Sequence, residues 1–336
     1  MARVTAILKA LNSAFRRDWK TFGSVAVNNF FPVTLFFLRQ AGVFLYLLAG
    51  AVVLFPMSTD PLRKIPRSRL DSWPLTAGER RLLRVLSPWV NPVTWVLAGL
   101  ACWAAWGKLT SGVWAIVAVI FGSGFFLSEL PSMRGIWFRR GVPSLPGPLN
   151  QLVRKNIREI LSTLDFYVAL LLTLGAAAWK IFGPPLPREA YLQMNLLALL
   201  ALSSYTQCLF GLDGNGGVSR YQLLPLPGWQ LLAAKDIAFL GIAVLLSLPV
   251  MPLPGIGAAL ICVAFGHSPS VKERREQVRW RFSSGVSLYF GFVQVILMAL
   301  AAAAVEFSSG LYVVGCLAVW TASVWWYGGR VREVLN

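Results

Sequence analysis

The sequence predicts an all-α polytopic membrane protein with about ten transmembrane helices in two parallel repeats, preceded by an amphipathic N-terminal helix. Hydrophobic residues make up 56% of the 336 residues and charged residues only 13%, which does not suit a soluble fold of this size. Several continuous apolar runs reach the length of about 20 residues that crosses a bilayer core. Basic residues gather in a few loops between these runs, as in the cytoplasmic loops of membrane proteins.

Two other classes of protein fit the composition less well. A membrane β-barrel would show short segments of alternating polarity, whereas these apolar runs are continuous. The formal net charge of +17 would suggest nucleic acid as the partner of a soluble protein. No base-reading module is visible, however, so we expect membrane lipids and no nucleic acid as partners.

The first 21 residues form the first predicted segment, an amphipathic helix that lies in the membrane interface. Basic side chains are interspersed along it, and no apolar core or cleavage site typical of a signal peptide follows. A helix of this kind binds an anionic membrane surface. Its apolar face is formed by Val4, Leu8, Leu11 and Phe15.

The apolar runs predict two transmembrane repeats, residues 22–182 and 183–336. The stretch 22–56 is read as two spans, although it could also be one long helix with a re-entrant piece. Spans at equivalent places in the two halves run in the same direction, which makes the repeats parallel. The predicted spans are residues 22–38, 41–56, 88–107, 112–131, 163–182, 190–211, 230–250, 251–267, 284–305 and 309–328.

The distribution of charge predicts the topology. Loops 57–87, 132–162 and 268–283 are rich in Lys and Arg, as are both ends of the chain, whereas the other connections are short and poor in charge. Because positive loops stay in the cytoplasm, all of these segments are expected on one side. An even number of spans and cytoplasmic termini follow, in the cytoplasmic (inner) membrane of a bacterium.

The sequence predicts no catalytic, cofactor-binding or metal-binding residues. His267 is the single histidine, and it is read as structural at the cytoplasmic end of its span. The cysteines are isolated within apolar runs and are read as small buried hydrophobic residues, not as ligands or disulfides: Cys102, Cys208, Cys262 and Cys316. No nucleotide-binding P-loop is present, so ATP hydrolysis is not expected in this chain.

Six ionisable residues lie near the ends of predicted spans. A proton relay would need carboxylates near the middle of a span, and none is found there. Placement in the interface, or snorkelling of a long side chain towards it, is the preferred explanation. These residues are Glu129, Asp165, Lys180, Lys235, Asp236 and Glu306.

A Pro-Leu pair followed by an amphipathic start to the next helix occurs twice, at Pro74-Leu75 and at Pro225-Leu226. Before the second copy lies the glycine-rich segment 211–217. It has three interpretations: a site for phosphate or Ca²⁺, a flexible turn that glycine permits, or part of a family motif.

The third interpretation comes from a resemblance. The run Leu209-Phe-Gly-Leu-Asp213-Gly, followed by Tyr221-Gln-Leu-Leu-Pro225-Leu-Pro-Gly-Trp-Gln-Leu-Leu-Ala-Ala-Lys235, resembles the permease subunits of ABC-2-type transporters. That family carries a "Phe-Gly-x-Asp-x-x-Gly … Leu-x-Pro-Leu … Leu-Leu-x-x-Lys" stretch before a membrane helix. The segment from Ile65 to Leu83 looks like the same element in the amino-terminal half.

The resemblance implies the permease subunit of an ATP-driven exporter, with ATP hydrolysis on a separate cytoplasmic ABC-type ATPase. A second copy of the permease or a homologous subunit would complete the complex. The repeated elements would dock in a cleft of the ATPase. Their expected contact residues are Pro74, Leu75, Arg80, Arg81, Pro225, Leu226 and Trp229.

Two alternatives remain open from the sequence. The chain could be a non-catalytic structural subunit of a membrane complex, which sequence hardly separates from a permease. It could also be a membrane-embedded, lipid-modifying enzyme, although such an enzyme would need a cluster of His, Asp or Glu at an interface. No predicted span carries a polar stripe that defines a transported ligand.

Overall fold

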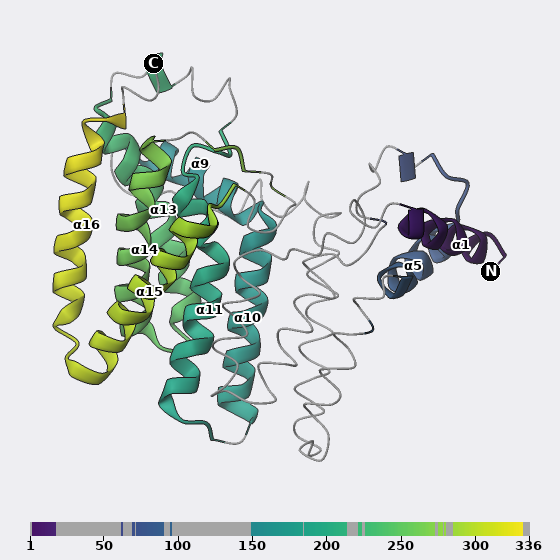
Figure 1. Ribbon diagram of the computed structural model, residues 1–336, viewed down its shortest axis with the longest axis horizontal. Helices are drawn as coiled ribbons and strands as arrows, with labels where there is room; N and C mark the ends of the chain where they lie inside the picture. Colours follow the sequence, from purple (N-terminus) through teal and green to yellow (C-terminus); the bar gives the residue numbers. More distant parts are fainter. Residues whose placement is uncertain are drawn as a thin grey trace. The chain divides into compact units, whose positions relative to one another are not determined.

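The computed structural model describes part of the chain, and all elements in that part are helical (Figure 1). The chain divides into two compact units, Met1–Val27 with Gly42–Ser128 and Asn28–Ala41 with Glu129–Asn336. The four predicted spans before residue 132 fall outside the description except at 88–90 and 95, so the ten-span repeat architecture stays a prediction. The described residues are 2–17, 62, 69–70, 72–90, 95, 149–183, 185–213, 221–223, 226–272, 275–277, 279 and 285–331.

The first unit contains α1 (Ala2–Arg17), α5 (Ala77–Leu86) and the 3₁₀ turn η2 (Ser87–Val90). Its small core joins Val4 and Leu11 of α1 to other apolar residues, Leu62 and Leu83. The basic side chains of α1 are exposed, so the helix is amphipathic as predicted. Part of its apolar face is covered by protein, because α1 packs against α5 and η2.

The second unit is a bundle of long antiparallel helices with the short α9 across one end (Figure 1). Within it, α14 packs against α11, α13, α15 and α16, and therefore lies at the centre of the bundle. Its elements are α9 (Asn150–Leu161), α10 (Leu164–Phe182), α11 (Arg188–Gln207), α13 (Gly228–Ser247), α14 (Pro252–Lys272), α15 (Leu288–Ala303), the π-helix η4 (Ala304–Ser308) and α16 (Tyr312–Gly328).

Caps and prolines set the ends of these helices. Thr163 caps α10 by accepting a hydrogen bond from the Phe166 N–H. Prolines precede α11 and α13 and begin α14, at positions where a missing N–H costs no helical hydrogen bond: Pro187, Pro227 and Pro252.

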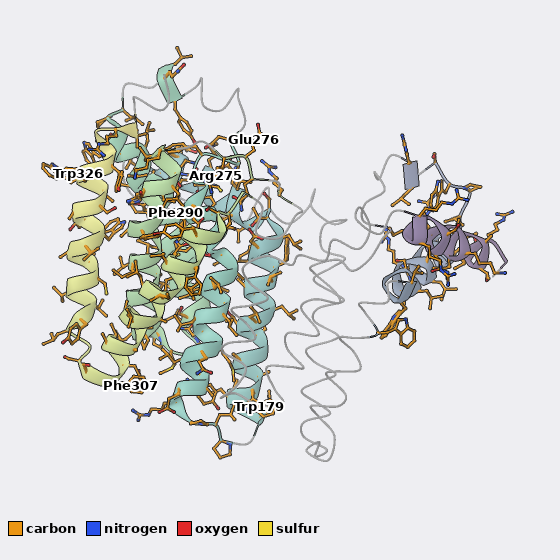
Figure 2. The ribbon with its side chains drawn as sticks, viewed as in Figure 1. Trp179, Arg275, Glu276, Phe290, Phe307 and Trp326 are labelled. Carbon is orange, nitrogen blue, oxygen red and sulfur yellow. The ribbon has the colours of Figure 1, made fainter. Side chains whose placement is uncertain are left out.

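The antiparallel course gives the bundle two distinct ends, which we name the α9 end and the hairpin end. The α9 end holds α9, the starts of α10, α13 and α15, and the ends of α11, α14 and α16 (Figure 1). The hairpin end holds the connections at 183–187, 248–251 and 309–311. Figure 2 places Arg275 and Glu276 at the α9 end, and Trp179 and Phe307 at the hairpin end.

Four helices are long and apolar enough to cross a membrane: Leu164–Phe182, Gly228–Ser247, Pro252–Lys272 and Tyr289–Ser308. Large apolar side chains on α15 and α16 point away from the protein, among them Phe292, Leu300 and Trp325. Such a surface is rare on a soluble monomer and suits contact with lipid. The described part of the chain therefore has the build of a multi-pass helical membrane protein.

All six predicted spans after residue 162 coincide with helices, but two fall short of a membrane span. Polar residues lower the hydropathy of α11, and α16 has only 17 residues. The boundaries also differ from the prediction, because α11 ends at Gln207 and α14 continues to Lys272. Segment 150–161, predicted as part of a loop, is the amphipathic helix α9.

Candidate functional site: buried polar contacts at the α9 end

The first group of polar contacts is centred on the Asp213 carboxylate, in the loop after α11. Lys235 Nζ, on α13, lies 2.7 Å from Asp213 Oδ2. The Tyr221 hydroxyl donates to Oδ1 at 2.8 Å, and Lys155 of α9 pairs with the same oxygen. The side chains of Asp213 and Lys235 are 0% and 1% exposed. This ion cluster therefore fastens the loop to both α9 and α13.

The electrostatics of the cluster keep Asp213 ionised. Burial alone would raise the pKa of this carboxyl, but the charge of Lys235 and hydrogen bonds from both lysines outweigh it and lower the pKa. Burial and the neighbouring Asp213 charge raise the pKa of Tyr221, which stays a neutral donor. Residues 214–217 of the glycine-rich segment lie outside the described part of the chain, so its interpretation as a phosphate or Ca²⁺ site stays a prediction.

Three ionisable side chains that were expected to reach water at the interface are instead buried within the protein. Asp165, Lys235 and Asp236 have at most 2% of their surface exposed. They lie within one or two turns of helix ends, as expected, but their partners come from other segments of the chain. A buried charge is tolerated because it is paired and hydrogen-bonded. Of the other three, Glu129 lies outside the described residues, Lys180 is exposed, and Glu306 lies 3.9 Å from Arg188.

Asp165 joins α10 to α11 and to the segment 275–279. Gln277 Nε2 donates to Asp165 Oδ2 at 3.0 Å and to Ser204 Oγ at 3.1 Å, and Ser204 in turn donates to Asp165. The Leu164 N–H also donates to the Arg279 carbonyl at 2.7 Å. The segment after α14 is thereby held against the start of α10.

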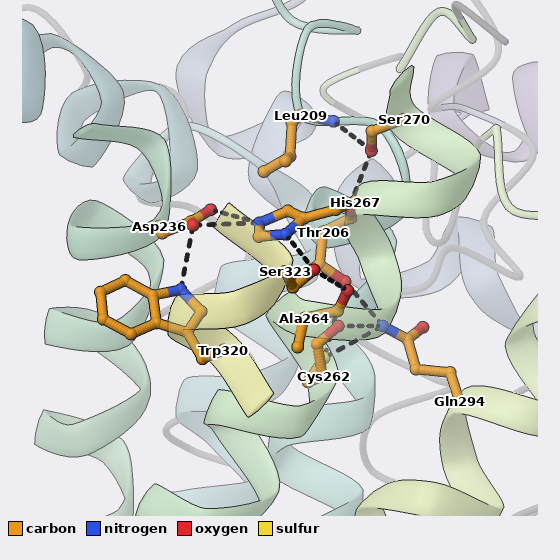
Figure 3. A network of polar contacts seen from close by, with 10 residues as sticks. All are labelled: Thr206, Leu209, Asp236, Cys262, Ala264, His267, Ser270, Gln294, Trp320 and Ser323. Atoms are coloured by element: carbon orange, nitrogen blue, oxygen red, sulfur yellow. Dashed lines mark hydrogen bonds and ion pairs between the residues drawn. The ribbon is translucent and has the colours of Figure 1, made fainter. Parts of the chain in front are cut away.

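A second buried group connects α13, α14 and α16 (Figure 3). His267 Nε2 lies 3.0 Å from Asp236 Oδ2, and its Nδ1 lies 2.7 Å from Ser323 Oγ. Trp320 Nε1 donates to the same carboxylate at 3.0 Å. His267 is 0% exposed, and its expected structural role agrees with these contacts, whereas its position relative to a membrane stays a prediction.

Asp236, His267 and Ser323 have the residue types of a hydrolase triad, but their hydrogen bonds favour a structural role. The Ser323 hydroxyl donates to the Ala264 carbonyl at 2.8 Å, so its single proton is not directed at the imidazole (Figure 3). Both ring nitrogens of His267 then face acceptors. The hydroxyl is thus held against the backbone of α14.

The amide of Gln294 forms a third group at the interface of α11, α14 and α15 (Figure 3). Its Nε2 lies 2.8 Å from Thr206 Oγ1 and 2.7 Å from the Cys262 carbonyl. Its Oε1 accepts from Gln207 Nε2 at 2.7 Å. This group was not expected: Gln294 stands alone in an apolar stretch, whereas Thr206 and Gln207 end the polar run 203–207, a local signal that the prediction did not use.

The predicted contact residues of the first unit lie at the start of α5. Thr76 and Glu79 form a capping box there, in which the Thr76 hydroxyl accepts from the Glu79 N–H and the Glu79 carboxylate accepts from the Thr76 N–H. These hydrogen bonds lower the pKa of Glu79. The side chains around the cap are placed as follows: Pro74 and Arg81 exposed, Leu75 and Arg80 half-buried.

The predicted contact residues of the second unit lie at the start of α13. Trp229 is 50% exposed, Leu226 is half-buried, and Pro225 lies outside the described residues. The backbone beneath Trp229 is closely packed, since a Cβ on Gly228 would lie 2.3 Å from the Gly328 carbonyl oxygen of α16. An exposed ring therefore stands on a rigid crossing of α13 and α16.

Within the described residues, no group of three or more His, Cys, Asp and Glu side chains could hold a metal ion. The three cysteines in this part, Cys208, Cys262 and Cys316, are buried and free, as expected. No protein-family model matches the chain, and comparison with curated proteins and with solved structures found no significant match. The resemblance to ABC-2-type permeases therefore rests on the motif residues alone.

Proposed function

We propose that this chain is the permease subunit of an ATP-driven, ABC-type exporter, and that it couples a separate cytoplasmic ATPase to substrate movement. One observation carries the proposal. The Asp and Lys of the motif-like segment, Asp213 and Lys235, form a buried ion pair, and Lys235 follows the exposed Trp229 by six residues on α13. The exposed surface around Trp229 therefore belongs to a candidate span, α13, that a buried ion pair ties to its neighbours.

The contacts around Trp229 provide a route for force. Trp229 lies in the first turn of α13, and Lys235 follows about two turns later on the same helix. Through Asp213, the lysine is linked to the end of α11 and to α9. A displacement of the start of α13 would therefore move these elements together, as expected of rigid-body coupling in a packed bundle.

The charge distribution supports a cytoplasmic position for the α9 end. Described basic residues at this end are Arg154, Lys155, Arg158, Lys272, Arg275, Arg279 and Arg330, whereas the hairpin end has Lys180 and Arg188 beside Glu189 and Glu306. By the positive-inside rule, this distribution supports a cytoplasmic position for the α9 end, in a bacterial cell. The docking surface would face the ATPase.

The proposal is tested by co-purification from membranes of the native host. A tagged wild-type chain should retain an ABC-type ATPase, identified by mass spectrometry. The double variant Trp229→Ala, Leu226→Asp should lose most of it, because exposed Trp residues often contribute about 2 kcal/mol or more to an interface. Trp325→Ala is the matched control, since Trp325 is an exposed tryptophan at the same end of the bundle.

The control variant should retain the ATPase at the wild-type level, and all variants should reach the membrane in equal amounts. Equal ATPase retention by the double variant would refute the docking surface. Absence of any ATPase from the wild-type preparation, together with retention of other membrane proteins, would favour the structural-subunit alternative.

A further inference from the structure

A basic cavity opens at the α9 end, and none of its lining residues belongs to the docking surface around Trp229. Its volume is about 380 Å³, which is within the range of small-ligand pockets. Four cations and one carboxylate line it, with a serine and a glutamine beside them: Arg154, Lys155, Arg158, Arg279, Glu159, Ser162 and Gln151.

The cations that line this cavity differ in whether they are paired with a carboxylate. Lys155 is already paired, with Glu159 at 3.2 Å and with Asp213. In the part of the chain that the structure describes, no carboxylate lies within ion-pair distance of Arg154, Arg158 or Arg279. In addition, Arg154 Nε is buried and makes no hydrogen bond there. Among the described residues, three guanidinium groups therefore line one cavity without a paired carboxylate, which is an arrangement that favours a phosphate.

The cavity is built from fixed parts of the fold. Arg154 and Arg158 lie four residues apart on α9, and therefore on one face of that helix. Arg279 comes from a distant segment, but the hydrogen bonds of its carbonyl to the Leu164 N–H and of Gln277 to Asp165 hold that segment in place. The backbone that carries the third guanidinium is thus anchored by buried contacts, and the Arg279 side chain itself is exposed.

The position of the cavity indicates the source of the phosphate. Ser162, which lines the cavity, is two residues before α10, the candidate span Leu164–Phe182. This is the depth at which a span leaves the hydrocarbon core and meets the lipid headgroups. Basic pockets at this depth bind anionic headgroups.

We propose that this cavity is a binding site for the phosphate of an anionic phospholipid, with Arg154, Arg158 and Arg279 as its ligands. The site is independent of the proposed docking of an ATPase, because it shares no residue with the surface around Trp229. Bound lipid would bridge α9 and the segment after α14 without any contribution from a partner protein.

Lipid retention by the purified full-length chain tests the proposal. Delipidated protein is titrated with phosphatidylglycerol or phosphatidylcholine, and bound lipid is counted by native mass spectrometry. The wild type should bind one phosphatidylglycerol in preference to phosphatidylcholine. The variant Arg158→Gln, Arg279→Gln should bind it about 25-fold more weakly, because each basic residue near an anionic lipid contributes about fivefold.

The matched control is Lys272→Gln, Arg330→Gln, which removes two exposed cations from the same end of the bundle but outside the cavity. It should bind phosphatidylglycerol within about twofold of the wild type, whereas generic attraction to charge would weaken both variants equally. Arg158→Lys, Arg279→Lys should recover part of the affinity, and thermal unfolding should be the same for all variants. Unchanged binding by the Gln double variant would overturn the proposal.

A competition experiment distinguishes the phosphate of a lipid headgroup from that of a soluble phosphate compound. Inorganic phosphate at millimolar concentration should displace little phosphatidylglycerol from the wild type. Tight binding of inorganic phosphate, lost in the Gln double variant and accompanied by no preference among lipids, would overturn the lipid assignment and indicate a soluble phosphate compound.

Discussion

At the scale of single residues, the bundle depends on buried charges whose partners come from distant parts of the sequence. Lys235 and Asp213 are 22 residues apart, and Lys155 and Asp213 are 58 apart. Removing two charges from water costs several kcal/mol each, so such a pair persists only when its hydrogen bonds are well satisfied. Tyr221 and Lys155 provide the additional bonds here.

Lys235→Met should lower the free energy of unfolding by about 3–5 kcal/mol, because it leaves part of the Asp213 charge buried without its partner. The double variant Asp213→Asn, Lys235→Met should lower the free energy of unfolding by less, since both charges are then removed. Chemical unfolding in detergent micelles measures both values. Equal losses in the single and double variants would contradict a role for the pair itself.

The stabilisation that the Asp213–Lys235 pair contributes should depend on pH. The pKa of Asp213 is lower in the folded chain than in the unfolded chain, so its stabilisation is complete above the unfolded value and is lost as pH falls through the folded one. The difference in stability between the wild type and Lys235→Met should therefore be constant near neutral pH. This difference between the two stabilities should become smaller below about pH 4.

The residue scale also marks the limit of prediction from sequence. Lys235 and Asp236 were recognised near a helix end, where the usual outcome is a side chain that reaches water. Nothing local reveals that Asp213 or His267 will lie opposite them, because the pairing depends on how α11, α13 and α14 pack. The motif-like spacing of Asp213 and Lys235 was the single local signal, and it suggested a docking element, not an ion pair.

At the scale of elements, prediction was better, because a long apolar run has few structures open to it in a membrane. Segment 163–182 became α10 at Leu164–Phe182, with its cap at Thr163. The predicted span 251–267 is too short at its carboxyl end, since α14 continues through Pro269 to Lys272. Helix α9 was missed because its many basic residues read as a loop, although their spacing leaves Val153 and Ile160 on the buried face.

The close crossing of α11 and α14 supplies the prediction at this scale. A Cβ on Gly266 would lie 2.5 Å from the Thr206 carbonyl oxygen, so Gly266→Ala should force the helices apart and cost about 1–3 kcal/mol. Gly241→Ala is the control, because nothing lies within 4 Å of a Cβ there. It should change the stability in micelles by about 1 kcal/mol or less.

Thermal unfolding of the two glycine variants, side by side in the same detergent, distinguishes packing from helix propensity. If both variants unfold at the same temperature, the crossing is looser than the structure indicates. A lowered temperature for Gly266→Ala alone would agree with the close approach.

At the scale of the whole molecule, the two ends of the second unit should lie on opposite sides of a membrane. In a chain whose native cysteines are replaced by alanine, Lys272→Cys and Leu186→Cys introduce single thiols at the α9 end and at the hairpin end. An impermeant maleimide added to intact cells should label only position 186, because positive loops stay inside. Labelling of both positions from outside would contradict the topology.

The equivalence of the two repeats stays a prediction at this scale. Pro74 belongs to the first unit and is described, whereas Pro225 of the second copy is not. The described starts of α5 and α13 differ in their caps, since Thr76 caps α5 with its side chain and Pro227 precedes α13 without one. A shared Pro-Leu pair therefore does not impose the same local hydrogen bonds.

The hairpin end has a consequence for the order of biosynthesis. Lys180 Nζ donates to the Val250 carbonyl at 2.7 Å and to the Pro249 carbonyl at 3.3 Å, both in the turn between α13 and α14. The ribosome makes this turn 70 residues after the lysine. At about 5–20 residues per second, the ammonium group waits roughly 4–14 s for its acceptors. Until then water, lipid phosphate or the insertion machinery must solvate it, so this contact between the end of α10 and the α13–α14 turn forms only after that turn has been translated.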